Sequence, residues 1–261
     1  HCPVSEKTLL LIQVGTPPDD IRAQVGDLPL WFSAALAAGP ALQVVRVFEG
    51  EPLPPHKAHS AAIITGSWAM VTDLLPWSEA TAQWIREAMA LEFPLFGVCY
   101  GHQLMAHALG GRVDYHPQGR EMGCLDIDLL PGAEDEALLA GAGPQFKANL
   151  THMQTVLELP PGARVLARSA HDPHQVVRYG PKAVSTQFHP EFSQAIAAAC
   201  IQLRAQVLQS EGFDPDAMLR QLAETPVPQQ MLQRFVAAYA LESAATAAEP
   251  RAVQADTSLT V

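Results

Sequence analysis

The first 110 residues alternate short apolar runs with longer amphipathic segments, and this alternation constrains the fold more than any other feature. Short runs rich in β-forming residues predict strands over 7–15, 41–50, 61–67 and 93–99. Apolar residues at helical spacing predict helices over 20–39, 77–92 and 101–110. Strands that alternate with helices of this length predict a parallel α/β sheet covered by helices on both faces.

The pattern changes beyond residue 110. Short β segments between Gly and Pro turns predict strands over 123–130, 145–150, 163–169, 174–180 and 182–188. Some of these strands are expected to be antiparallel, which makes the sheet mixed but mostly parallel. Helical spacing returns over 193–210, 214–224 and 228–242. We therefore predict a main domain over 1–192, a helical extension packed on it over 193–242, and a flexible Ala-rich tail over 243–261.

Composition excludes several classes of protein. The chain has 261 residues and a formal net charge of −11, which repels phosphate backbones and argues against nucleic-acid binding. No apolar stretch reaches the roughly 18 residues needed to cross a membrane, and the N-terminus has no signal-type core. The widely spaced cysteines argue against a disulfide framework and against a thiol zinc site; they are Cys2, Cys99, Cys124 and Cys200. We expect reduced thiols, a cytoplasmic location and no membrane partner.

The segment GVCYG, residues 97–101, has the pattern of a nucleophile elbow between a predicted strand and a predicted helix. Gly97 and Gly101 would let neighbouring backbone pack against a tight turn. Cys99 would then lie at a helix N-terminus, where the helix dipole favours a thiolate. The N–H of Tyr100 would be placed to donate to an oxyanion. A buried core cysteine is the alternative interpretation.

A thiol nucleophile needs a base, and the base needs a group that orients it. His189 follows a predicted strand in the segment QFHPEF, and Glu191 comes two residues later. His189 could reach Cys99 from a neighbouring strand end, with Glu191 fixing its tautomer. Three histidine pairs have spacings seen at metal sites. The pairs 56/59 and 171/174 lie in Pro-rich or turn-rich loops without an obvious third ligand, and the spacing of 102/107 places its members on different faces of a helix. We therefore predict neither a metal nor a cofactor.

Together, these segments resemble those of the class I (triad) glutamine amidotransferases. GVCYGHQLMAHALGG is similar to the family's nucleophile motif, and QFHPEF is similar to its His/Glu motif. REMG (120–123) and THMQTV (151–156) resemble pocket segments in the amidotransferase domain of GMP synthase, and ITGSWAMV (64–71) resembles an oxyanion loop. The likeness covers residues 7–192 and implies a flavodoxin-like three-layer sandwich.

The resemblance also implies a role for each matching residue. Cys99 would attack the γ-amide of glutamine or of a γ-glutamyl compound, and His189, oriented by Glu191, would move the proton. The backbone N–H groups of Gly66 and Tyr100 would hold the oxyanion. The substrate would be held by Gln103, Met153 and Gln154. One departure concerns the substrate, because Gln154 replaces an acidic residue that pairs with the ammonium group of glutamine in the GMP synthase domain.

The fate of the leaving group stays open at this point. The chain shows no synthase domain and no nucleotide-binding loop, so ammonia would pass to a separate synthase subunit, or the protein would act alone as a γ-glutamyl peptidase or hydrolase. The helices after residue 193 would be either a lid or a docking surface, or would simply pack on the sheet. A catalytically silent amidotransferase-like binding module is a further alternative. The last alternative is a different hydrolase with a nucleophile elbow, or a redox-stress protein with a reactive cysteine.

Overall fold

The computed structural model describes residues 8–37 and 39–240. Within these ranges one sheet contains strands in the order β2-β1-β3-β4-β11-β10-β9-β6-β7. The strands of its parallel half are β1 (Thr8–Gln13), β2 (Leu42–Arg46), β3 (His59–Ile64), β4 (Leu95–Val98) and β11 (Ala183–Thr186). Its antiparallel half contains β10 (Val176–Gly180), β9 (Arg164–Arg168), β6 (Glu121–Leu129) and β7 (Gln145–His152). The mixed sheet predicted from the sequence is confirmed.

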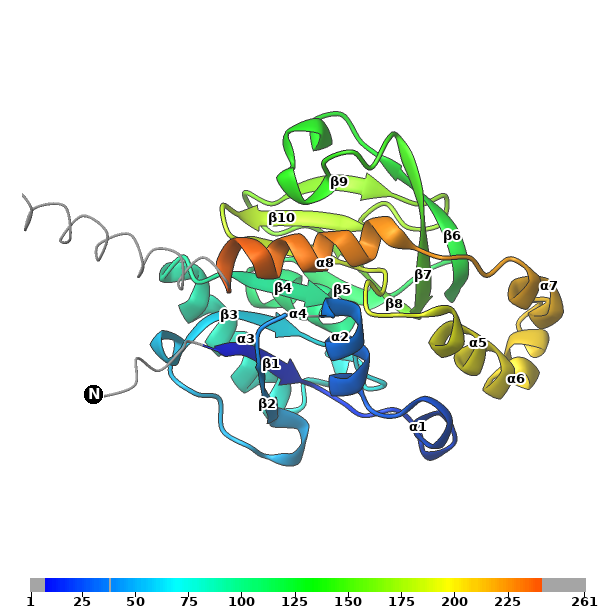
Figure 1. Ribbon diagram of the computed structural model, residues 1–261, viewed down its shortest axis with the longest axis horizontal. Coiled ribbons are helices and arrows are strands. Elements are labelled where there is room, and N and C mark those ends of the chain that lie inside the picture. The colour runs from blue at the N-terminus through cyan, green and yellow to red at the C-terminus, as the bar shows by residue number, and fades with distance from the viewer. Residues whose placement is uncertain (1–7, 38, 241–261) are drawn as a thin grey trace, which may run out of the picture.

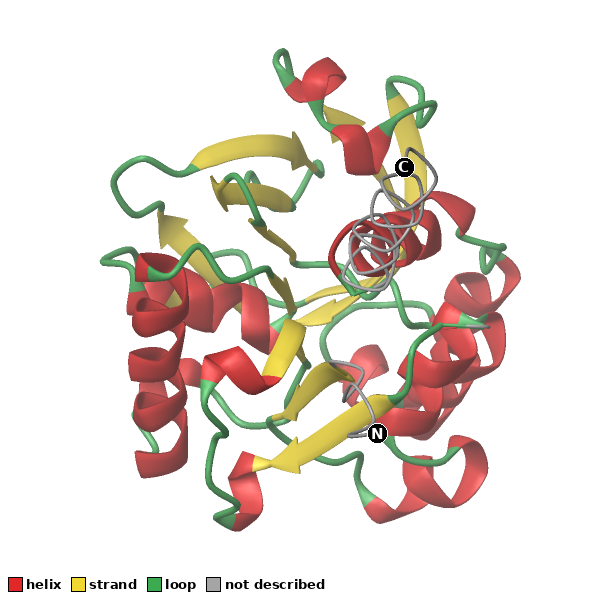
Figure 2. Cartoon of the chain, turned by 60° about the vertical axis from the view of Figure 1, so that its left-hand side comes forward, coloured by secondary structure: helices red, strands yellow, loops and turns green. Residues whose placement is uncertain are grey.

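Helices cover both faces of the parallel half, which gives three layers (Figures 1 and 2). One face is covered by α3 (Pro76–Ala90) and α4 (Tyr100–Ala108), and the other by α2 (Leu28–Leu36) and α8 (Pro226–Tyr239). The alternation of strand residues explains this arrangement. Leu9 and Leu11 of β1 face α2 and α8, whereas Leu10 and Ile12 face α3 and α4.

The other helices lie beyond the carboxyl end of β1 (Figure 1). They are α1 (Asp19–Val25), α5 (Gln194–Leu203), α6 (Ala205–Ser210) and α7 (Pro215–Arg220). Their apolar side chains form a third cluster, separate from the cores on the two faces of the sheet. This cluster covers the end of the sheet where parallel strands of α/β proteins present their ligands.

Three predicted boundaries are wrong, each for a local reason. The helix predicted over 20–39 is two helices, because Gly26 ends α1 with φ 82° and the carboxylate of Asp27 caps the N-terminus of α2. The strand predicted over 41–50 ends at Arg46, and a 3-10 turn follows up to Glu49. The helix predicted over 193–210 is interrupted at Arg204, between α5 and α6.

A second, two-stranded sheet was not predicted. It pairs β5 (Arg112–Tyr115) with β8 (Gln154–Glu158) in antiparallel fashion. Met153 separates β8 from β7, so two strands follow each other almost without a turn signal. The tail predicted over 243–261 lies outside the described residues, and the domain boundary at residue 192 stays a prediction.

Helix α8 is part of the central core. Phe235 is fully buried and its ring lies edge-on to that of Phe96 on β4, with 5.4 Å between the centroids. We expect Phe235→Ala to lower the free energy of unfolding by about 3–5 kcal/mol, because it removes a large buried ring and leaves a cavity. Urea denaturation measures this loss. The matched control is Leu30→Ala on α2, where the side chain is 61% exposed; an equal loss for both variants would contradict the assignment of α8 to the core.

Candidate active site

Cys99 links the end of β4 to the start of α4. Its backbone has φ 53° and ψ −99°, a conformation that is strained for a residue with a Cβ atom. The strained strand-to-helix turn predicted from GVCYG is therefore confirmed. The Cys99 thiol lies 3.7 Å from the carbonyl oxygen of Thr151 on β7 and borders a cavity. Cys99 is buried, with 6% of its surface exposed, and it packs in a core cluster while also lining the cavity, so the role of its thiol stays a prediction.

Two glycines allow this turn to form. A Cβ atom on Gly97 would lie 2.6 Å from the sulfur of Met105 and 2.7 Å from the carbonyl oxygen of Gly101. A Cβ atom on Gly101 would overlap the carbonyl oxygen of Ile64 on β3. The absence of both side chains lets β3, β4 and α4 approach closely enough to hold Cys99 in its strained conformation.

The topology of the sheet brings the predicted groups together. β3, β4 and β11 are parallel neighbours, and their carboxyl ends lead to Gly66, Cys99 and His189 respectively. The N–H of Cys99 donates to the carbonyl oxygen of Thr186 at 2.9 Å, which joins two of these strand ends. A Cβ atom on Gly66 would lie 3.1 Å from Cε1 of His189 and 3.6 Å from Cβ of Cys99. Residues that are far apart in the sequence therefore meet at one edge of the sheet.

His189 is oriented by Glu191. The Nδ1 atom of His189 lies 3.0 Å from Oε2 of Glu191, and both side chains are buried. Because a carboxylate only accepts, Nδ1 carries the proton, and Nε2 has no hydrogen-bond partner among the described residues. Burial lowers the pKa of His189, but the negative charges of Glu191 and Cys99 outweigh this effect and raise the pKa above its ordinary value.

Two backbone donors are available beside Cys99. Among the described residues, no hydrogen bond uses the N–H of Gly66 or that of Tyr100. Thr65 fixes this region, because its carbonyl oxygen accepts from Gly101 and its hydroxyl accepts from the N–H of Val14 at the end of β1. The arrangement leaves two N–H groups that could stabilise an oxyanion.

The three residues predicted to hold a substrate all border the cavity, but two of them have further contacts. The amide nitrogen of Gln103 donates to the carbonyl oxygen of Gln154 at 2.7 Å and to Gln187 at 3.0 Å. Gln154 is 1% exposed, and its amide nitrogen donates to the hydroxyl of Thr72 at 2.6 Å. Gln154 is therefore not a surface residue. It connects β8 to the segment that follows Gly66.

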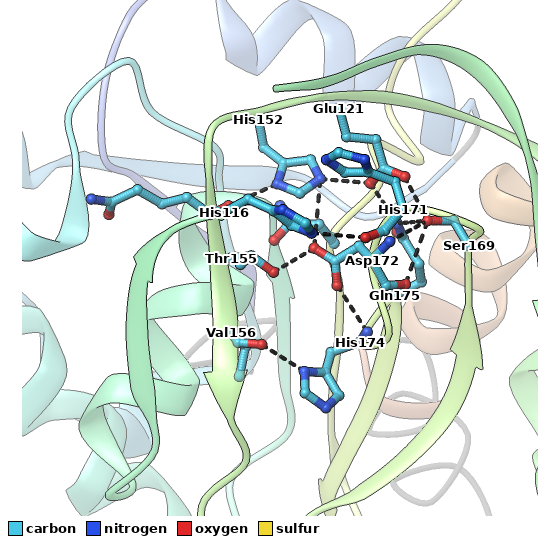
Figure 3. A network of polar contacts seen from close by, with 12 residues as sticks. His116, Glu121, His152, Thr155, Val156, Ser169, His171, Asp172, His174 and Gln175 are labelled. Carbon is cyan, nitrogen blue, oxygen red and sulfur yellow. Dashed lines mark hydrogen bonds and ion pairs between the residues drawn. The ribbon is translucent and has the colours of Figure 1, made fainter. Parts of the chain in front are cut away.

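A buried polar network joins His152 to Glu121 and Asp172 (Figure 3). Nε2 of His152 lies 2.7 Å from Oε1 of Glu121, and Nδ1 lies 2.7 Å from the carbonyl oxygen of Gln154. Both partners only accept, so both ring nitrogens carry a proton and His152 is an imidazolium. Burial opposes this charge, but the hydrogen bond and the charge of Glu121, together with the charge of Asp172, raise the pKa of His152.

The two carboxylates of the network are satisfied by further donors. Glu121 accepts from Ser169 at 2.5 Å and from Gln175 at 2.8 Å, and Asp172 accepts from the hydroxyl of Thr155. Burial raises the pKa of Glu121, but its hydrogen bonds, led by the one from His152, lower it below the ordinary value. The positive charge on His152 is thus compensated by buried carboxylates. The hydrogen bonds of His152 hold the β7–β8 junction in place beside the cavity.

The same three groups are close enough together to suggest a metal site. Ligand atoms of Glu121, His152 and Asp172 lie within 4.8 Å of one another. A metal needs a lone pair on an imidazole nitrogen, and both nitrogens of His152 donate to oxygen. The cluster therefore fits an internal ion pair better than a metal centre. Two of the histidines with metal-like spacing have other partners. His102 forms a hydrogen bond with the hydroxyl of Ser185, and His107 forms one with the carboxylate of Glu79.

These residues border a cavity of about 320 Å³ that contains Cys99, His189 and Glu191 on its lining. The profile of the family described as Glutamine amidotransferase class-I matches residues 42–201. The chain belongs to the class-I glutamine amidotransferase family. Within the described residues, no helix of this amidotransferase combines the length and the apolarity needed to cross a membrane.

Similar proteins support this assignment. A GMP synthase of Thermomicrobium roseum is 35% identical over 136 residues, which is 52% of this chain but only 24% of the relative's length. One subunit of the glutamine-hydrolysing GMP synthase of Ignicoccus hospitalis is 32% identical over 53% of this chain and 70% of its own. A glutamine amidotransferase of Thermotoga maritima has the same fold, with a TM-score of 0.71 at 22% identity over 88% of this chain and 98% of its own. The flavodoxin-like sandwich is thereby confirmed.

Two parts of the site were missed by sequence reasoning. Asp172 lies in the segment SAHDPHQ, whose polar character is typical of an exposed loop, although Asp172 is fully buried. The available signal for Asp172 was the high number of His, Asp and Ser residues between two predicted strands. Trp31 and Phe192 also border the cavity, with rings 5.6 Å apart. No local pattern links them, because only tertiary packing brings α2 against the segment after His189.

We expect Gly101→Ala to lower the free energy of unfolding by about 2–3 kcal/mol, because the new Cβ atom would overlap backbone that cannot move cheaply. Denaturant titration measures this loss. Gly180→Ala is the matched control, because its nearest neighbour is the flexible methyl of Met89 at 3.3 Å. Equal stabilities for both variants would show that the turn tolerates a side chain.

We expect Glu121→Gln to destabilise the fold by about 3 kcal/mol, because it leaves a buried imidazolium without its main partner. The ion pair of Glu121 and His152 contributes its full stabilisation to the fold between pH 4.5 and pH 6.5. Above pH 4.5 a Glu side chain is ionised in the unfolded chain, and below pH 6.5 a His side chain is protonated in the unfolded chain. The difference from wild type shrinks as the pH falls through the lowered pKa of Glu121 or rises through the raised pKa of His152. Urea titrations across this range measure it.

Ser169→Ala is the control for this prediction, because it removes one donor to Glu121 and keeps both charges. Its loss should be smaller, about 1–2 kcal/mol, and should depend less on pH. A Glu121→Gln loss that stays constant from pH 4 to pH 10 would argue for a neutral His152.

Proposed function

We propose that this amidotransferase hydrolyses γ-glutamyl amides through a γ-glutamyl thioester on Cys99. The observation that carries the proposal is the position of Cys99. It lies on a strained turn beside an imidazole whose Nδ1 is held by Glu191 and whose Nε2 is free. A nucleophile, a base and a group that orients the base are the requirements of covalent amide hydrolysis.

In this proposal Sγ of Cys99 attacks the γ-carbonyl carbon of the substrate while His189 holds the thiol proton. The N–H groups of Gly66 and Tyr100 stabilise the tetrahedral oxyanion. His189 then gives its proton to the leaving nitrogen, and the amine or ammonia departs. Water attacks the thioester with His189 as base, which releases glutamate and restores the thiol.

The acyl part of the substrate would lie against Gln103, Met153 and Gln154. Their positions support this, because all three line the cavity and Gln103 holds the carbonyl of Gln154. Glu191 is the one carboxylate that lines the cavity within the described residues, and it is already bonded to His189. The α-amino end of a substrate would therefore meet no free carboxylate of the described residues, and the carbonyl oxygens of Met153 and Gln154 there already accept from His116 and from Gln103 and His152 respectively.

A second candidate function is the supply of ammonia to a separate synthase. The relative from Ignicoccus hospitalis supports this candidate, because its name describes one subunit of a glutamine-hydrolysing GMP synthase and this chain covers 70% of it. In that case glutamine would be the substrate, and turnover would rise when the synthase binds.

We expect Cys99→Ala to reduce glutamate release from glutamine and from γ-glutamyl amides by at least about 10³-fold, because no thioester can form. An enzymatic glutamate assay measures the rate, and mass spectrometry of quenched wild-type protein detects the acyl adduct. Cys124→Ala is the matched control, since Cys124 is buried on β6 away from the cavity lining. Wild-type protein that releases no glutamate from any of these substrates would support the silent binding module instead.

A further inference from the structure

The cavity at Cys99 has two walls of different chemistry. One wall contains the segment after Gly66, Gln103 and the residues at the start of β8. The other wall is mainly apolar and comes from α1, α2, α6, β6 and the segment after His189; it contains Ile21, Leu28, Trp31, Met122, Phe192 and Val207. The first five of these residues belong to the third apolar cluster, which also contains side chains of α5, α6 and α7. We call this second wall the helical wall.

His189 contacts the helical wall through Phe192. The ring of His189 stacks on that of Phe192 with 4.3 Å between the centroids, and Phe192 meets the edge of Trp31 at 5.6 Å. In the proposed reaction the leaving nitrogen lies within about 3 Å of Nε2 of His189, because it takes up the proton there. A substituent on that nitrogen points away from the acyl group. It therefore meets the helical wall.

The cavity holds the γ-glutamyl part and the leaving group of a substrate together, and its apolar side next to His189 extends beyond what ammonia requires. Its volume of about 320 Å³ falls within the range of pockets that hold drug-sized ligands, roughly 300–1,000 Å³. Ammonia, by contrast, is no larger than a water molecule and gains nothing from an apolar wall. The room beside His189 therefore fits a leaving amine that carries a carbon substituent.

The charges at the edge of the helical wall are already paired. Arg120 lies 2.8 Å from Glu211, and Arg204 lies 2.9 Å from Asp20. Both positive charges are thereby compensated, so they favour a charged substituent less than free arginines would. An apolar substituent would gain free energy chiefly by covering the exposed part of Val207, because the other five residues of the wall are only 1–8% exposed.

We propose that the helical wall is a leaving-group subsite and that the preferred substrates are γ-glutamyl amides of apolar amines. This inference rests on the proposed function and adds the class of the leaving amine. The competing interpretation is that the wall conducts ammonia toward a synthase, which makes glutamine the best substrate.

The test compares three substrates of the full chain: glutamine, γ-glutamylmethylamide and γ-glutamylbenzylamide. The two substituted amides release alkylamines, so the difference between them is chiefly the phenyl ring that the subsite would bind. Glutamate release gives kcat/KM for each. We expect the benzylamide to exceed the methylamide on the order of tenfold, since apolar contacts of this size discriminate to about that extent.

A variant then locates the preference on the helical wall. Val207 on α6 borders the cavity and is 44% exposed, so the fold should tolerate Val207→Asp. The new carboxylate would face the phenyl ring, and we expect the preference for the benzylamide to fall about tenfold. Leu91→Asp is the matched control, because Leu91 is 65% exposed and lies outside the cavity lining; this variant should keep the preference.

Some results would overturn the leaving-group subsite alone, and others would overturn the thioester chemistry as well. Glutamine turned over faster than both amides, or equal rates for the two amides, would overturn the subsite while leaving the thioester chemistry intact. A benzylamide preference that survives Val207→Asp would place the ring elsewhere and would also overturn it. Hydrolysis of none of the three substrates would end the proposed function, and the subsite with it.

Discussion

The site depends on one steric constraint, the close approach of backbone around Cys99. The positive-φ conformation of this residue is costly by about 1–3 kcal/mol, and it persists because β3, β4 and α4 meet where Gly97 and Gly101 have no side chains. The same contacts continue into the core on both faces of the sheet. The fold thus supplies the free energy that holds Cys99 in this conformation at the strand ends, close to Gly66 and His189.

Two buried histidines flank this turn, and their hydrogen bonds separate their roles. His189 has one nitrogen on Glu191 and one without a partner among the described residues, so in the proposed reaction it would exchange a proton with the substrate. His152 has both nitrogens committed, to Glu121 and to the carbonyl of Gln154, so it is a fixed charge that cannot act as a base. A buried imidazolium with two strong partners is a positioning element, because it holds the backbone that borders the cavity.

The sequence predicted the residues that meet at the strand ends but not the residues that enclose them. Cys99 and His189 could be placed because each directly follows a parallel strand, and the carboxyl ends of neighbouring parallel strands share one edge of a sheet. The break between α1 and α2 is signalled by Gly26 and Pro29 and capped by Asp27, but the apolar spacing that continues across it led to the prediction of one helix. Asp172 and Trp31 escaped prediction because their burial comes from tertiary packing, which leaves no period in the local sequence.

The cavity is assembled from separated stretches of the chain. Cys99 and His189 come from the ends of β4 and β11, inside the segment 42–201 that matches the family. The helical wall combines α1 and α2, which precede this segment, with Met122 and Phe192 inside it and α6 after it, and Asp20 on α1 pairs with Arg204. A change at Phe192 or Trp31 would reach His189 through the stacked rings, whereas Val207 is 44% exposed and lies outside the apolar cluster. In the proposed reaction, the leaving-group preference is therefore easiest to change at Val207 while Cys99 and His189 stay in place.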